Sequence, residues 1–224
     1  MDVNPALVLS LWTGGTAACG AVVAWWRIVG SGYSWLTGAV VAVLGVGAGA
    51  AGSGRLAYAG AVLAIAGALM GRRPRLAAAF FAGSAVAFGL AAGADSPWIP
   101  VLSGMAFLGG VTATMMLGHW YLVDPRLPRS ALERLDVVAG AGLLIDFIYM
   151  VLNGALEWMP ADAILGWAFV ALTLMTFLLL VAVWYSLQEP SYTGVMAATG
   201  LSYLAVLTSF GVVVLGRLLA FGSS

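Results

Sequence analysis

Long apolar runs separated by short polar breaks make up most of the chain. A hydrocarbon core about 30 Å thick is spanned by roughly 20 helical residues, whereas a barrel strand needs only about 10 in an alternating pattern. The length of the runs therefore predicts an all-α fold, a polytopic membrane helix bundle that forms a single transmembrane domain over residues 1–224. The eight predicted helices lie near residues 6–26, 34–52, 56–71, 75–93, 98–122, 132–157, 163–187 and 193–220.

The cationic residues concentrate in alternate breaks between these runs, and all of them are arginine because the chain contains no lysine. If all eight runs cross the membrane, seven arginines face the same side: Arg27, Arg72, Arg73, Arg75, Arg126, Arg129 and Arg134. Only Arg55 and Arg217 fall on the other side. The positive-inside rule makes the side with seven arginines cytoplasmic, so both termini are predicted to lie outside.

Composition supports the membrane assignment and excludes several kinds of site. The chain is 62% hydrophobic and 8% charged, whereas soluble domains carry about 25% charged residues. Its formal net charge of zero gives no reason to expect nucleic acid as a partner. Cys19 is the only cysteine, which excludes an intrachain disulfide and a cysteine-cluster metal site. The absence of lysine excludes a P-loop and a retinal Schiff base. Arginine in place of lysine, with abundant Ala, Gly and Val, suggests a high-GC bacterial gene, and hence a multi-pass protein of the bacterial cytoplasmic membrane.

A faint internal similarity suggests a duplication. Glycine pairs at residues 14–15 and 109–110 precede aromatic pairs at 25–26 and 120–121 with the same spacing. Both stretches would run from outside to inside, so the pattern predicts a parallel repeat of four plus four helices. Glycine-rich helices that end in interfacial aromatic residues also resemble one another by chance, and that alternative stays open.

The sixth run carries the clearest set of polar residues. Small and polar residues recur every three or four positions and share one helical face: Ala139, Gly142, Asp146, Tyr149, Asn153 and Glu157. Asp146 is expected near the bilayer midplane, where an ionisable residue costs about 2.5–3.5 kcal/mol. It should therefore face the bundle interior as a proton-relay or ligand-binding carboxylate, with Tyr149 and Asn153 as hydrogen-bond partners. The alternative is a neutral Asp that ties helices together. Glu157 is expected at the outer interface, solvated or paired with Arg217.

The second candidate is His119, the only histidine, about one turn inside the cytoplasmic end of the fifth run. It could hydrogen-bond a quinone carbonyl, accept a proton, or serve as a single haem ligand with Met115 or Met116 as the other axial partner. An interfacial histidine bonded to a neighbouring helix or a lipid headgroup is the plainer interpretation. No other metal site is predicted. By helical rise, His119 and Asp146 should lie roughly 15 Å apart.

The third candidate is the charged loop over residues 124–136, whose arginines Arg126, Arg129 and Arg134 could dock a cytoplasmic partner or an anionic headgroup. Ser130 and Glu133 fit a capping box, so a helix start with positive-inside arginines is the simpler explanation.

Three functions are consistent with these patterns. The first is an accessory or quinone-interacting subunit of a respiratory or photosynthetic-type redox complex, not a catalyst on its own. Its cofactor would be quinone or, less readily, haem, and its partners the lipid bilayer and other redox subunits. The outline of the chain is similar in architecture to quinone- and haem-handling membrane subunits. The second is a small-solute or proton-coupled permease centred on Asp146, and the third is a structural scaffold without a site.

Overall fold

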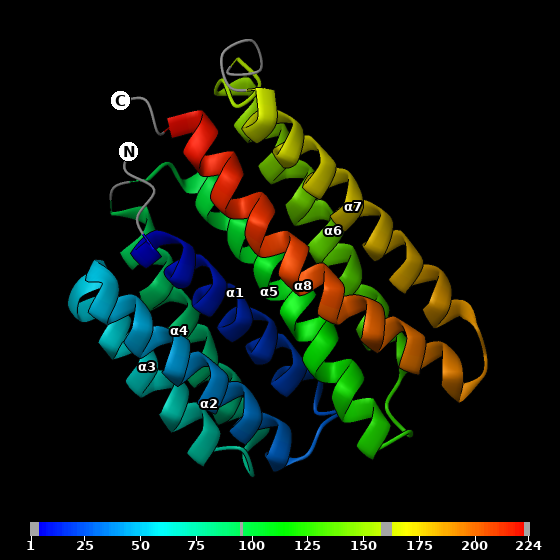
Figure 1. Ribbon diagram of the computed structural model, residues 1–224. Helices are drawn as coiled ribbons and strands as arrows, with labels where there is room; N and C mark the ends of the chain where they lie inside the picture. Colours follow the sequence, from blue (N-terminus) through cyan, green and yellow to red (C-terminus); the bar gives the residue numbers. More distant parts are fainter. Residues whose placement is uncertain (1–4, 95, 158–162, 222–224) are drawn as a thin grey trace.

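The computed structural model describes residues 5–94, 96–157 and 163–221. Within these residues the chain forms α-helices and one π-helical turn, with no strand (Figure 1). The elements are α1 (Pro5–Trp26), α2 (Ser31–Ala48), a π-helical turn (Gly49–Ser53), α3 (Gly54–Leu69), α4 (Pro74–Gly93), α5 (Trp98–Val123), α6 (Arg129–Leu152), α7 (Ala163–Gln188) and α8 (Tyr192–Phe221). The predicted all-helical bundle is confirmed.

Seven helical segments of the described chain are long and apolar enough to cross a membrane, as expected of a multi-pass membrane protein. One of them, Ser31–Leu69, contains 39 residues and includes both α2 and α3. The chain reverses within it because Gly52 has a φ of 119° and Gly54 a φ of 69°, a region that favours glycine. As a result α2 and α3 lie side by side as an antiparallel pair (Figure 1).

The ends of α6 differ from the expectation. The helix ends at Leu152 rather than near residue 157, and Gly154, with a φ of 92°, lies in the turn that follows. At its other end the helix begins at Arg129, directly after Pro128, and no side chain caps it. The predicted capping box of Ser130 and Glu133 is therefore wrong, because the helix starts one residue before that serine.

The helices form two groups of four that meet along α1 and α5. In the first group α1 packs against α2 and α4, and α3 packs against α2 and α4. In the second group α5 and α7 pack in the same way against α6 and α8. The connections after α1, α3, α5 and α7 lie at one end of the bundle, which we call the arginine end (Figure 1). The start of α1 and the end of α8 lie at the opposite end (Figure 1).

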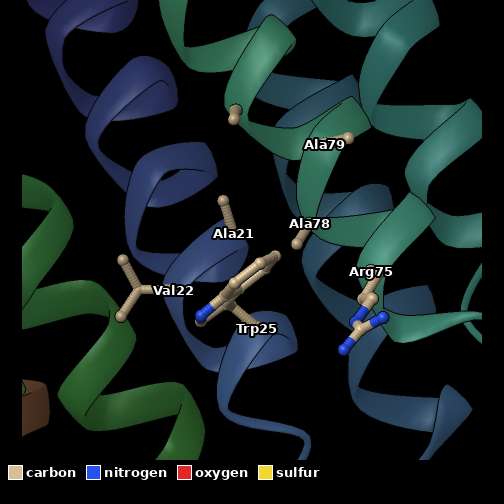
Figure 2. A pocket seen from close by; sticks show the side chains of 7 residues that line it. Ala21, Val22, Trp25, Arg75, Ala78 and Ala79 are labelled. Atoms are coloured by element: carbon tan, nitrogen blue, oxygen red, sulfur yellow. The ribbon is translucent and has the colours of Figure 1, made fainter.

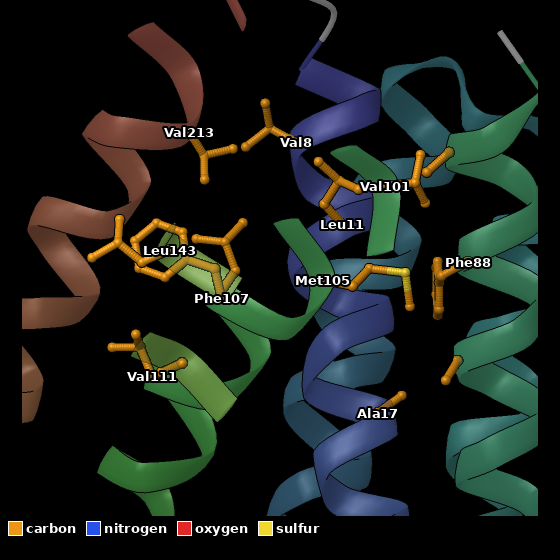
Figure 3. Close-up of a cluster of buried hydrophobic side chains, with 14 of the residues drawn as sticks. Val8, Leu11, Ala17, Phe88, Val101, Met105, Phe107, Val111, Leu143 and Val213 are labelled. Carbon is orange, nitrogen blue, oxygen red and sulfur yellow. The ribbon is translucent and has the colours of Figure 1, made fainter. Parts of the chain in front are cut away.

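The junction between the two groups is held by close backbone contact. A Cβ atom on Gly15 would overlap the carbonyl oxygen of Met105, and one on Gly109 would overlap the backbone of Gly15. Glycines at such crossings let two membrane helices approach closely and gain dispersion contacts. Figure 3 shows Met105 extending from α5 toward Phe88 of α4, within the buried cluster that joins both groups. The central helices are thus α1 and α5, with the others around them.

Candidate functional site

Asp146 of α6 forms an ion pair with Arg217 of α8 inside the bundle. The two side chains meet in a bidentate arrangement, with Arg217 Nη1 at 3.0 Å from Asp146 Oδ2 and Nη2 at 3.0 Å from Oδ1. Each residue is 1% exposed. Parallel N–H donors of a guanidinium match the two oxygens of a carboxylate, so this geometry is among the strongest available to an ion pair.

Helix α5 adds two hydrogen bonds to this ion pair. The hydroxyl of Ser103 donates to Asp146 Oδ1 at 2.8 Å, and Arg217 Nη2 donates to the carbonyl oxygen of Pro100 at 2.7 Å. Gly104 makes room for the guanidinium, because a Cβ there would press on Arg217 Nη2. The cluster of Asp146, Arg217, Ser103 and the Pro100 carbonyl therefore ties three helices together, and we call it the ion-pair cluster.

This cluster bears on two expectations, the depth of Asp146 and the partner of Arg217. Asp146 lies six residues before the last residue of α6, about 9 Å by helical rise, which is about as far from that end as from the middle of the helix. Arg217 is paired with Asp146, not with Glu157, which is exposed in the turn after α6. A narrow crevice reaches Arg217 from Ser96 and Phe221, but it leaves no space for a water molecule.

The predicted hydrogen-bond partners of Asp146 do not reach it. Asn153 is exposed, and its side-chain amide donates to the carbonyl oxygen of Tyr149 at 2.8 Å. Tyr149 is half-buried against the hydrophobic core. Asn153 and Tyr149 therefore bond to each other at the end of α6. The hydrogen bonds to Asp146 that were predicted for them come from Ser103 and Arg217 instead.

His119 is exposed and lies at the arginine end of α5. Ser103, which bonds Asp146, is sixteen residues earlier in the same helix, a separation of about 24 Å by helical rise. The expected separation of roughly 15 Å was too short, because Asp146 is deeper toward the opposite end. His119 lies at the arginine end, whereas Asp146 bonds to Ser103 near the opposite end of α5. Met116, one turn before His119, is buried.

The three arginines of the predicted docking loop have different surroundings. The guanidinium of Arg129 donates to the carbonyl oxygens of Glu189, Pro190 and Ser191, so it fastens the connection between α7 and α8. Arg126 is exposed. Arg134 lies over the ring of Trp26 from α1, with 5.7 Å between the guanidinium carbon and the ring centroid.

Arg134 and Trp26 stand at one end of an apolar groove that sequence reasoning missed. The groove has a volume of about 280 Å³ and runs along α1, α5 and α6. Its lining also includes Gly15, Ala18, Cys19, Val22, Leu102, Met105, Ala106, Leu135 and Val138. We call it the Arg134 groove. It combines apolar walls with a cation at one end, as a ligand with an apolar tail and a polar head requires.

Asp136 is a second buried acid that the sequence analysis did not single out. It is 4% exposed, and its Oδ1 has no hydrogen-bond partner among the described residues. Asp136 lies in the turn after Arg134 on α6, on the buried side of the helix and outside the groove lining.

Within the residues that the structure describes, no three His, Cys, Asp or Glu side chains gather closely enough to hold a metal ion. No protein-family model, curated protein or solved structure matches this chain.

Proposed function

We propose that the chain is an accessory, quinone-interacting subunit of a redox complex in the bacterial cytoplasmic membrane. In this proposal all eight helices cross the membrane, the arginine end is cytoplasmic, and both termini lie outside. The observation that carries the proposal is the Arg134 groove, whose apolar walls come from three helices and which ends at a guanidinium and an indole.

The chemistry of the groove suits a prenylated quinone. Apolar side chains of α1, α5 and α6 offer a surface for an isoprenoid tail. Arg134 has no carboxylate within ion-pair distance among the described residues, so its N–H groups are available to a quinone carbonyl oxygen. Trp26 beside it offers an aromatic face to a planar ring. The bound quinone would supply electron transfer, and the residues of the groove would position its head near the cytoplasmic surface.

The other two functions receive unequal support. A permease centred on Asp146 needs a cavity that reaches this carboxylate, and neither the Arg134 groove nor the crevice at Arg217 includes Asp146 in its lining. A scaffold is supported by the ion-pair cluster, whose groups are all engaged with one another. The ion-pair cluster itself is thus better explained as a tie between helices than as a site.

The test is photolabelling of the purified protein with a short-tailed azidoquinone, followed by mass spectrometry of the labelled peptides. We expect label on α1 or α6 near Trp26 and Arg134, and competition by excess unlabelled quinone. Arg134→Gln removes a charged donor worth about 1.5–3 kcal/mol and should weaken the competition about tenfold or more. Arg126→Gln, an exposed arginine of the same loop, is the matched control and should change nothing.

The outcomes of this experiment distinguish a quinone-binding subunit from a scaffold. Label that does not respond to competitor, or an equal response of the two arginine variants, would leave the scaffold as the better explanation. Co-purification of other redox subunits from the native membrane tests the complex itself. We expect such subunits to be recovered with the wild-type chain.

A further inference from the structure

A second groove lies between α1 and α4 at the arginine end, and it shares only Val22 with the Arg134 groove. Its volume is about 350 Å³. The floor is built of four alanines, Ala21 from α1 and Ala78, Ala79 and Ala82 from α4. Two larger side chains, Trp25 from α1 and Arg75 from α4, stand at the end. Figure 2 shows Trp25 lying across the groove toward Ala78, with Arg75 at the same end. Trp25 is 63% exposed, so its ring lies at the surface of the bundle.

The charge around this groove is strongly one-sided. Residues 5–94 include five arginines and no Asp or Glu. Four of these arginines gather at the arginine end, at Arg27 after α1 and at Arg72, Arg73 and Arg75 around the start of α4, and all four are exposed. Among the described residues no carboxylate lies within ion-pair distance of any of them. The first four helices thus present uncompensated positive charge beside an apolar groove.

From these two observations we propose that the groove between α1 and α4 binds an anionic phospholipid of the cytoplasmic leaflet. The phosphate lies against Arg75 and the neighbouring Arg72 and Arg73, and one acyl chain occupies the alanine floor beneath Trp25. Basic pockets between transmembrane helices on the cytoplasmic side recognise anionic headgroups in this way. The groove opens between membrane helices, so the occupant is a bilayer lipid, not a soluble phosphate compound. The proposal does not depend on quinone binding, because the Arg134 groove shares only Val22 with this one.

The test is native mass spectrometry of the full chain after exchange into nanodiscs that contain equal amounts of phosphatidylcholine and phosphatidylglycerol. We expect phosphatidylglycerol to be retained on the released protein in preference to phosphatidylcholine. Arg75→Gln should lower this retention about tenfold or more, as loss of one charge-assisted contact implies. Ala79→Leu places bulk in the groove at an exposed position and should lower retention of both lipids.

Arg55→Gln is the matched control, because Arg55 is an exposed arginine of the same half at the opposite end of α3. It should leave retention unchanged. Thermal unfolding of each variant checks that the bundle is intact. Equal retention of the two lipids, equal effects of Arg75→Gln and Arg55→Gln, or displacement of the lipid by soluble glycerol phosphate would each overturn the proposal.

Discussion

Replacing Asp146 with Asn tests whether the ion-pair cluster holds the second group of helices together. The substitution preserves the size of the side chain and removes its charge. Asp146 accepts two hydrogen bonds from Arg217 at 3.0 Å and one from Ser103 at 2.8 Å. In the variant, Arg217 keeps its positive charge in a position where it is 1% exposed.

The size of the effect follows from this burial. Two unit charges about 4 Å apart attract by about 4 kcal/mol at an effective dielectric constant of about 20. Removal of one partner from a buried pair typically costs about 3–5 kcal/mol, because the remaining charge stays desolvated. We therefore expect Asp146→Asn to lower the free energy of unfolding by about 3–5 kcal/mol. Arg217 is close to the end of α8, and movement of its head toward the interface would place the loss at the lower end of this range.

A second substitution separates charge loss from general damage. Arg217→Met combined with Asp146→Asn removes both charges and should recover most of the lost stability, since apolar replacements of buried pairs are often neutral. The coupling energy of this double-mutant cycle should be about 2–3 kcal/mol. Unfolding in mixed micelles with increasing SDS, followed by circular dichroism, measures all four proteins.

Asp136→Asn is the matched control on the same helix. Its Oδ1 has no hydrogen-bond partner among the described residues, so loss of this charge should leave stability unchanged or raise it by about 1–3 kcal/mol. Asp146→Asn is thus expected to lower stability, and Asp136→Asn is not. Equal losses for Asp136→Asn and Asp146→Asn, or additive losses in the cycle, would refute the role given to the ion pair.

Two further predictions concern the helix junction and the topology. Gly109→Ala should destabilise the bundle by about 1–3 kcal/mol in the same unfolding assay, because its methyl group meets the α1 backbone. Gly140→Ala, where a Cβ meets nothing within 4 Å, should be neutral or stabilising by up to about 1 kcal/mol, and a loss equal to that of Gly109→Ala would contradict the close contact. In a Cys19→Ala background, Arg55→Cys and Arg72→Cys should react with a membrane-impermeant maleimide from opposite sides of the membrane. Labelling of both from the same side would exclude a membrane crossing by α3, and with it the proposed eight crossings.

The helices were predictable because their lengths are fixed by the membrane and their ends by charge. Arg72 and Arg73 mark the turn before α4, and Ser53 with Gly54 marks the break between α2 and α3. The end of α6 was missed because a three-or-four-residue spacing led the prediction on to Glu157. Gly154 was the signal for the stop, since a glycine with positive φ commonly follows the last helical residue.

The ion pair was only half predictable. The position of Asp146 within an apolar run showed that it needed a partner, but periodicity compares residues on one helix only. Arg217 lies 71 residues away on α8, and Ser103 lies 43 residues away on α5. A usable signal was present, because Arg217 falls inside the last apolar run, where an arginine also requires a counter-charge.

The two buried acids of α6 suggest where function should be sought. Asp146 has every oxygen engaged by groups from neighbouring helices, so a change of its charge state would weaken the bundle. A group with that role is poorly suited to bind and release a ligand in each cycle. Arg75 and Arg134 at the arginine end differ from Asp146, because among the described residues no carboxylate lies within ion-pair distance of either. Each of them also stands beside an apolar groove. Ligand binding at that end would satisfy these charges without disturbing the contacts that hold the helices together, which is why both proposals place their ligands there.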